Sequence, residues 1–446
     1  MLRFLVSLLA GGLVIGGAWF GWTRSADVEA TVAGPADRVV ESSGVGAGGD
    51  GTTSGSDTPT SPSTSTGSAG DRTTTATHSP SPSGSGTRSA GTPTGQPLST
   101  QGTDPGRGCS RPGPTDAAGM DVLMAQLDGE PTLEGGDHGG SVALADGRRM
   151  FVFGDTIRDT DVVTPFMVRN SVLIANGGCV KPMATDDDGP VIPDDGSLGQ
   201  WPMSLRATAV AGGTRVQVIT ATVKSLGHGD FETIGSNLAT FEVPTKRMPR
   251  LVSVAPLGQR SDDPRVPTWG AAMWDSGGHT YLFGTSSNAT KSTEGWALHV
   301  ARVPSDQLAD TSRWQYWDGS DWVTGQPSAA QGEAAQLVDA DGGVSHVLGV
   351  VERGGSWYAV SKEGDFEGTW LTVWKAPSVT GPWTKHRIRS LANDSSIRRY
   401  TPLVHPDVRT SSGRLLVSWS ESPTTSGPYF THPELYRPRF AEISLP

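Results

Sequence analysis

Residues 41–108 lack the side chains that build a folded core. Between Glu41 and Gly108 there is no aromatic residue and no lysine, and the only larger aliphatic residues are Val45 and Leu98. Such a segment cannot bury enough apolar surface to offset the entropy of ordering its backbone. We therefore expect residues 27–108 to be a disordered Ser/Thr/Pro/Gly-rich stalk, and residues 109–446 to form one sizeable domain.

Cysteine and clustered positive charge are also scarce. The chain has two cysteines, Cys109 and Cys179. In an exported protein this pair predicts one disulfide that joins the start of the domain to its first structural unit, with two unpaired thiols as the alternative. The formal net charge is −11 and no block of Lys and Arg occurs. These features argue against a nucleic-acid partner, and no residue cluster predicts a metal or cofactor.

Long apolar runs are limited to the N-terminus. Residues Phe4 to Trp22 are almost entirely apolar, between Arg3 and Arg24. A run of about 19 residues is close to the length that spans a bilayer. We favour an uncleaved signal anchor over residues 1–26, with a cleaved signal peptide as the alternative. Either predicts an extracytoplasmic domain, held at the cell surface by the membrane in the first case and secreted in the second.

Helical periodicity is weak after Cys109, where short β-branched or aromatic runs alternate with Gly-rich turns. Five such hairpins recur, over residues 135–156, 201–224, 269–288, 344–364 and 400–422. Matching points in their first strands, taken as Asp137, Arg206, Ala271, His346 and His405, lie 59 to 75 residues apart. Each hairpin is followed by a return strand. This repeat predicts an all-β domain with the fold of a five-bladed β-propeller; an irregular β-sandwich is the competing fold.

The first hairpin brings two carboxylates together. Facing residues of an antiparallel pair have numbers with a constant sum. A two-residue turn at Asp146–Gly147 places Asp137 opposite Thr156 and His138 opposite Asp155, whereas a turn one residue longer places Asp137 opposite Asp155. Like charges at this spacing destabilise a sheet, which favours a catalytic role for Asp137 and Asp155. The alternative is that each carboxylate only caps a turn.

The same arithmetic places other polar side chains at matching ends of the later hairpins. It predicts that His346 faces Glu363, that His405 faces Ser420 beside Glu421, and that Trp269 faces Ser286. Loops on the same face add further polar groups. The candidate substrate-binding residues are His138, Arg169, Asn170, Arg206, Trp269, His346, His405 and Glu421, with Trp269 as the candidate for stacking on a sugar.

Paired carboxylates surrounded by such groups are typical of glycoside hydrolysis. Nucleophile-elbow, HEXXH and phosphate-loop signatures are absent from the sequence. A carbohydrate-binding domain without catalysis, in effect a wall-anchored lectin, and a scaffold for envelope proteins are the alternatives.

The stretch GGDHGGSVALADGRRMFVFGDTI resembles the opening motif of a bacterial secreted family long catalogued as a domain of unknown function. Its members are described as endo-D-arabinanases that act on mycobacterial-type cell-wall arabinan. The segments WGAAMW…YLFGTSSN, WYAVSKEG and YTPLVHPDV…GRLLVSWSES resemble its later repeats, so the likeness covers roughly Leu127 to Pro446.

This resemblance implies a five-bladed propeller in which the acidic residues of the opening motif, here Asp137 and Asp155, are catalytic. Similar arabinan-cleaving enzymes commonly add a Glu from a later blade. Glu363 and Glu421 are the candidates, and we favour Glu363 because His346 faces it. His138 replaces the small residue expected after the first Asp. We therefore predict a cell-surface glycoside hydrolase for furanoside linkages, with the D-arabinan of an actinobacterial envelope as its polysaccharide substrate.

Overall fold

The computed structural model describes residues 109–227, 230–287 and 295–446. The expected anchor (1–26) and stalk (27–108) lie outside these residues. Within the described part of the chain, no helix is long and apolar enough to cross a membrane.

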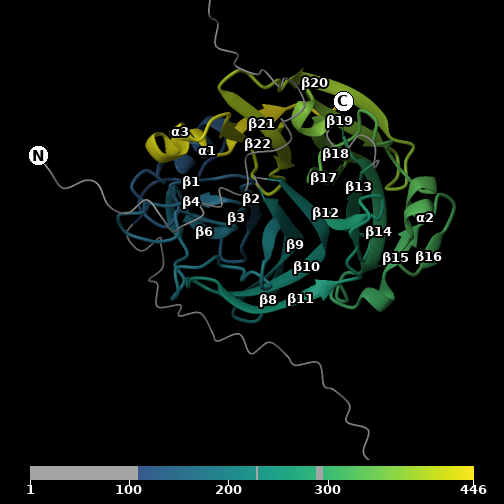
Figure 1. The fold of residues 1–446 in the computed structure, drawn as a ribbon, viewed down its shortest axis with the longest axis horizontal. Helices are drawn as coiled ribbons and strands as arrows, with labels where there is room; N and C mark the ends of the chain where they lie inside the picture. Colours follow the sequence, from purple (N-terminus) through teal and green to yellow (C-terminus); the bar gives the residue numbers. More distant parts are fainter. Residues whose placement is uncertain (1–108, 228–229, 288–294) are drawn as a thin grey trace, which may run out of the picture. The chain divides into compact units, whose positions relative to one another are not determined.

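Most of the regular structure in the described chain is antiparallel sheet (Figure 1). Sheet 1 holds β2 (Gly140–Ala143), β3 (Arg149–Phe153), β6 (Ser171–Asn176) and β7 (Cys179–Pro182). Sheet 2 holds β8 (Leu198–Val210), β9 (Gly213–Gly227), β10 (Asp230–Pro244) and β11 (Arg250–Leu257). Sheet 3 holds β12 (Thr268–Ser276), β13 (His279–Ser286), β14 (Ala297–Pro304), β15 (Gln315–Trp317) and β16 (Trp322–Thr324).

Sheet 4 holds β17 (Gly349–Arg353), β18 (Ser356–Glu363), β19 (Trp370–Ala376) and β20 (Thr384–Ser390). Sheet 5 holds β21 (Ile397–Val404), β22 (Leu415–Pro423) and β23 (Arg439–Ile443). A small sixth sheet holds β1 (Gly135–Gly136), β4 (Thr156–Ile157) and β5 (Met167–Val168). The helices are α1 (Ala117–Ala125), α2 (Ala329–Ala334) and α3 (Gly427–Thr431), with short 3₁₀ turns η1 (Thr311–Arg313), η2 (Asp365–Glu367) and η3 (Pro433–Leu435).

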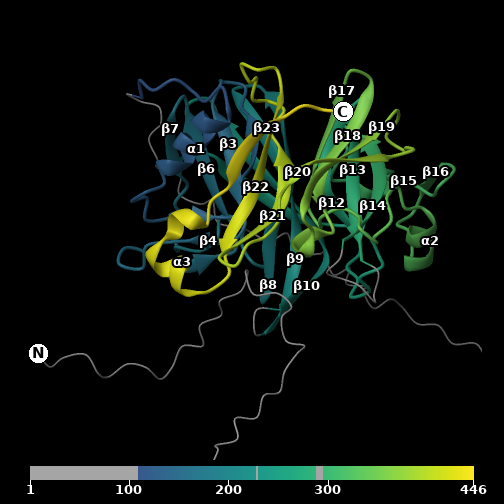
Figure 2. The ribbon, with the colours of Figure 1, turned by 90° about the horizontal axis from the view of Figure 1, so that it is seen from above.

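The five larger sheets pack in sequence order, each against the next through an apolar cluster. Phe241 lies in the cluster between sheets 1 and 2, Leu282 between sheets 2 and 3, and Trp374 between sheets 3 and 4. Leu371 lies between sheets 4 and 5. The turned view in Figure 2 separates the sheets and shows β8–β10, the longest strands among them.

Packing rather than strand pairing joins sheet 5 to sheet 1. Helix α1 and the chain after it share one apolar cluster with Phe151 of sheet 1 and with Leu416 and Phe440 of sheet 5. The backbone N–H of Ala117 also donates to Glu442 of β23 at 3.3 Å. No strand pairing joins these two sheets in the described residues. The arrangement is therefore propeller-like, with a helix beside the last strand where a sheet-closing strand would lie.

The first strands of all five sheets surround one cavity of about 330 Å³. Its lining includes Val142 of β2, Leu205 of β8, Met273 of β12, Val350 of β17 and Leu403 of β21. Because these strands run side by side around the cavity, their starting ends gather on one side of it. The candidate site lies at that end.

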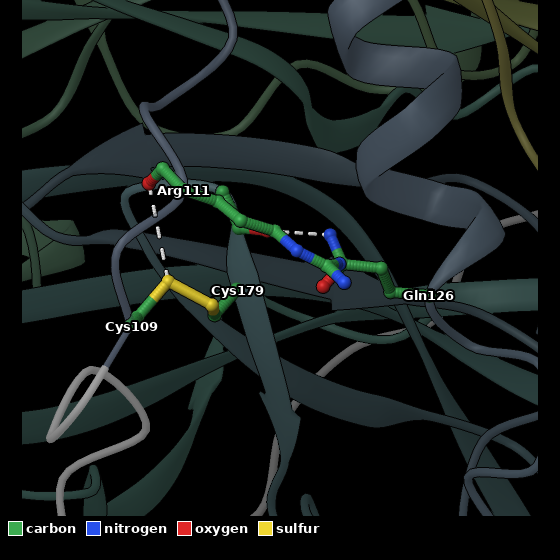
Figure 3. Close-up of a disulfide and its surroundings, with 5 residues drawn as sticks. Cys109, Arg111, Gln126 and Cys179 are labelled. Atoms are coloured by element: carbon green, nitrogen blue, oxygen red, sulfur yellow. Dashed lines mark hydrogen bonds between the residues drawn. A yellow bond between two sulfur atoms is a disulfide. The ribbon is translucent and has the colours of Figure 1, made fainter.

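The predicted disulfide is present and fixes the N-terminal edge of the domain (Figure 3). Cys109 and Cys179 are bonded with their Cα atoms 6.1 Å apart, across 70 residues of sequence. Beside the bridge, the Gln126 side-chain amide donates to the carbonyl of Gly178 at 2.5 Å. The bridge thus ties the segment that leads into α1 to the edge strand β7.

We expect replacement of both cysteines by serine to lower the free energy of unfolding by roughly 2–4 kcal/mol, because the open chain gains the entropy that the cross-link removes. Urea titration of the full chain, with and without reductant, measures the difference. An unchanged midpoint in the variant would show that the bridge does not stabilise the domain.

Candidate active site

The two carboxylates of the opening motif face each other across the first hairpin. Residues Gly136↔Thr156 and Gly140↔Val152 pair on either side of them, so the facing numbers sum to 292 rather than 293. The turn is therefore one residue longer than two, and Asp137 lies opposite Asp155, the second of the two predicted registers. The Asp137 N–H donates to the Asp155 carbonyl at 3.3 Å.

A glycine leaves room for the first carboxylate. A Cβ atom at position 154 would lie 2.3 Å from Oδ1 of Asp137, which no real contact tolerates. The Gly154 N–H also donates to the Asp137 carbonyl at 3.1 Å. Gly154 immediately precedes Asp155 in the Phe-Gly-Asp-Thr motif, which explains locally why a glycine stands there.

The environments of the two carboxylates differ. Asp155 is 3% exposed, and its Oδ1 accepts from the indole N–H of Trp201 at 2.9 Å. Burial raises the Asp155 pKa well above its usual range, and the charge of Asp137 adds to this, while Arg169 opposes it. Asp137 is only partly buried, and its Oδ2 accepts from the Tyr400 hydroxyl at 2.8 Å. Burial raises its pKa to about 6, against the lowering effect of that hydrogen bond.

A group of tyrosines from the end of the chain surrounds the pair. Tyr400 belongs to β21, Tyr429 to α3, and Tyr436 follows η3. The Tyr429 and Tyr436 rings meet edge to face with centroids 5.2 Å apart. The negative charge of Asp137 contributes to a raised pKa in all three phenols, after burial, so all three stay protonated at neutral pH. Of the three, Tyr400 of sheet 5 donates its hydroxyl to Asp137, whereas the Tyr429 hydroxyl donates to the Pro423 carbonyl at 3.4 Å.

Further aromatic rings lie against Trp201 and next to Tyr429 in the sequence. The Phe231 ring of β10 packs edge-on against Trp201 at 4.4 Å. Phe430, beside Tyr429 on α3, is 52% exposed, and its ring stacks on Phe166 at 4.4 Å. An exposed ring of this kind suits the apolar face of a sugar.

Arg169 is the one predicted substrate-binding residue whose side chain acts on the pair. Its Nε lies 3.7 Å from Oδ2 of Asp194, and its charge lowers the Asp155 pKa.

His346 lies beside a second buried carboxylate at the matching end of sheet 4. Its ring contacts Trp296 edge to face at 4.6 Å, and the Trp296 indole donates to Asp365 at 2.6 Å. Burial raises the Asp365 pKa to about 6.

The structure corrects the role predicted for Glu363. Its carboxylate binds Arg387 through both oxygens, at 2.7 and 2.9 Å, and Lys385 at 2.8 Å. These contacts, with the Arg387 hydrogen bond first, hold its pKa at about 2. A carboxylate so fully neutralised by strand β20 is neither a proton donor nor a free base. The other candidate, Glu421, is similarly engaged by Arg399 at 3.0 Å and Arg439 at 3.3 Å.

His405 and Asn170 are engaged by neighbouring parts of the domain. Both ring nitrogens of the fully buried His405 meet serine hydroxyls at 2.8 Å, from Ser141 and Ser418. The Asn170 amide donates at 2.9 Å to the carbonyls of Ile192 and Gln200, and so fixes the entry to β8.

The side chains of His138, Trp269 and Arg206 contact other parts of the domain. His138 is 5% exposed and covers Gly140, where an added Cβ would lie 2.8 Å from its Nε2. Trp269 is 4% exposed and packs on Tyr316, so it is not a stacking platform for a sugar. Arg206 lies near the other end of β8.

The guanidinium of Arg206 is held by Asp275 at 2.9 Å and by the carbonyl of Ser305 at 2.5 Å. Two errors of alignment explain the predictions for Arg206 and His405. Matching Arg206 and His405 to Asp137 took positions several residues beyond Trp201 and Tyr400, which are the residues that contact the pair. The residues missed as a result, Trp201 and Tyr400, open those hairpins as Asp137 opens the first, which was the available signal.

Comparison with solved structures found several similar proteins. A Bacteroides ovatus protein described as a candidate hydrolase matches with a TM-score of 0.54 and 19% identity, over 72% of this chain and 89% of its own. A GH43_1 enzyme from Xanthomonas citri matches with a TM-score of 0.39 and 14% identity, over 72% and 93% of the two chains.

An endo-arabinase from Bacteroides thetaiotaomicron matches with a TM-score of 0.40 and 12% identity, over 71% and 96%. The first of these likenesses shows a shared fold. No curated protein matches the sequence. A family model described as a domain of unknown function, DUF5005, matches residues 127–444, and the chain therefore belongs to this family.

Proposed function

We propose that the domain is a glycoside hydrolase and that Asp137 and Asp155 carry out the reaction. The observation that carries this proposal is the placement of two carboxylates on facing residues at one end of a sheet, both with raised pKa values and one within reach of solvent. Mutual repulsion and burial disfavour such a pair unless it serves a reaction. Hydrolysis of a glycosidic bond needs one carboxylic acid and one carboxylate.

The different environments assign the two roles. Asp155 is the more deeply buried and also feels the charge of Asp137, so it holds a proton and donates it to the leaving oxygen. Asp137 is partly exposed and hydrogen-bonded by Tyr400, so it is the carboxylate that attacks the anomeric carbon or activates a water molecule. Arg169 and the exposed Phe430 ring are the groups we assign to binding of the glycan.

We propose furanoside linkages, and D-arabinan in particular, as the substrate. The support is the resemblance of the opening motif to endo-D-arabinanases. We further propose that residues 109–446 form a five-bladed β-propeller, supported by five sheets whose first strands surround one cavity. The apolar segment 1–26 and stalk 27–108 would hold this domain outside the membrane of an actinobacterial-type cell, a location that suits a disulfide-bonded domain.

Activity should fall on the acidic side of pH 6. Asp137 must be ionised to act, and its pKa is about 6. Protonation below that pH removes the reacting carboxylate, so we expect kcat/KM to drop about tenfold per pH unit. A pH–rate profile on an arabinofuranosyl oligosaccharide measures this limb. A rate that is level down to pH 4 would exclude Asp137 as the ionised partner.

A further inference from the structure

A buried lysine next to the rejected Glu363 has no part in the reaction above. Lys362 lies on β18 with none of its side chain exposed. Its ammonium group donates to the Phe366 carbonyl at 3.0 Å, the Asn393 Oδ1 at 3.0 Å and the Arg399 carbonyl at 2.6 Å. Burying a cation costs free energy, which its hydrogen bonds to the three acceptors offset. Removing the cation therefore destabilises the structure around those acceptors. Its contacts therefore indicate what it holds.

The three acceptors belong to the segments that position Tyr400. Arg399 is its neighbour in sequence, and the Phe366 ring lies 5.0 Å from the Tyr400 ring. Asn393 joins the two segments directly, because its amide donates to the Phe366 carbonyl at 2.8 Å and its oxygen accepts from the Arg399 N–H at 2.9 Å. Lys362 and Asn393 thus link the segment that contains Phe366 to the segment that carries Tyr400.

Backbone strain explains why the hydrogen bonds of Lys362 and Asn393 are needed. Asp365 and Thr401 both have left-handed backbone conformations, with φ of 51° and 48°. Each costs of order 1–3 kcal/mol for a non-glycine residue and persists only where surrounding contacts enforce it. These two residues directly precede Phe366 and follow Tyr400. Asp365 and Thr401 therefore flank the ring contact that Lys362 holds in place.

We propose that Lys362 is a positioning residue that, through Phe366 and Arg399, holds the Tyr400 hydroxyl on Asp137. The hydrogen bond at 2.8 Å from that hydroxyl stabilises the ionised form of Asp137. Removing the ammonium group leaves the buried Arg399 carbonyl without this donor, leaves the Phe366 carbonyl with Asn393 alone, and frees the Tyr400 ring to move. Asp137 then loses a donor and becomes a stronger base. This inference rests on the proposed function only for its effect on the reaction.

Several charged and titratable groups lie around Asp137 and Lys362. Asp137 faces Asp155 on its own hairpin, with Tyr400 and Tyr436 from the end of the chain. The Lys362 ammonium feels the acidic Asp365 and Glu367 and the basic Arg398 and Arg399. Burial lowers the Lys362 pKa to about 8, so the ammonium form prevails below that pH.

The test is a double-mutant cycle in the full chain, read by the pKa of Asp137. Aspartate carbons are labelled with ¹³C, and the Asp137 signal is identified by its loss in Asp137→Asn. We expect Lys362→Met and Tyr400→Phe each to raise the pKa of Asp137 by about one unit, as expected for loss of a hydrogen bond to a charge. The double variant should show no further shift, because both changes remove the same contact.

Lys375→Met is the matched control. Lys375 lies on β19 of the same sheet, donates to the carbonyl of Pro446 at 2.8 Å, and should leave Asp137 unchanged. If Lys362→Met does not fold, Asn393→Ala takes its place in the cycle with a smaller expected shift in the same direction. Additive shifts, or a folded Lys362 variant with the wild-type pKa of Asp137, would overturn the proposal. Because the readout needs no substrate, failure to cleave glycans would count against the proposed function alone.

Discussion

Replacing Asp155 by asparagine is expected to lower kcat for glycan cleavage by about 10³-fold or more. An amide keeps the shape of the side chain and can still accept from the Trp201 indole, but it carries no transferable proton. General acid catalysis contributes about 10²–10⁴-fold. Asp137→Asn should be impaired to a similar degree, because an amide neither attacks the anomeric carbon nor activates water. Release of new reducing ends measures both losses.

Asp318→Asn is the control for these two variants. Asp318 is an exposed turn residue between β15 and β16, whose Oδ1 accepts from the backbone N–H groups of Ser320 and Asp321. The same chemical change there should leave activity at the wild-type level. Circular dichroism should show all three variants folded. If both site variants retained wild-type rates, neither carboxylate would belong to the reaction.

Asp137→Asn is also expected to stabilise the domain at neutral pH. The folded-state pKa of Asp137 is about 6, above the ordinary value of 3.8. A raised pKa gives stability that is complete below about pH 4 and is lost as pH rises through 6. Asparagine has no proton to lose and escapes that loss. The shift of about two units corresponds to about 2 kcal/mol at pH 7, after allowance for solvent screening.

Asp155→Asn should change stability in the same direction, since burial and Asp137 both raise the pKa of Asp155. Urea unfolding at pH 7 and at pH 4 measures both variants. The gain should be present at pH 7 and absent at pH 4. An equal gain at the two pH values would trace it to packing, and a loss at pH 7 would show that the folded state prefers the ionised carboxylates.

Hairpin arithmetic predicted the register well where turns are tight. In the fourth hairpin Arg353↔Ser356 gives the expected sum of 709. In the third, Ser276↔His279 starts in the expected register, but an irregularity between Trp269 and Ala272 moves Trp269 opposite Gly284. A β-bulge inserts a residue without any fixed sequence signal, so positions beyond it cannot be derived from the turn.

Longer turns and ion pairs limited the prediction further. The fifth hairpin pairs Val404 with Val417 and then Tyr400 with Ser420, so its turn is longer than assumed and Tyr400 takes the place given to His405. The neutralisation of Glu363 depends on Arg387, 24 residues later on another strand. Pattern alone does not show such contacts between strands. The pair Asp137 and Asp155 was predictable because one short hairpin carries both.

The most direct test of the account is incubation of the full chain with purified arabinan, alongside a pyranose polymer of similar size, at pH 6 to 7. We predict new reducing ends and shorter chains from the arabinan, in proportion to enzyme and time, and none from the same amount of Asp155→Asn. Retention of the glycan on the protein without any new reducing end would contradict it, and would identify the domain as one that binds glycans without cleaving them.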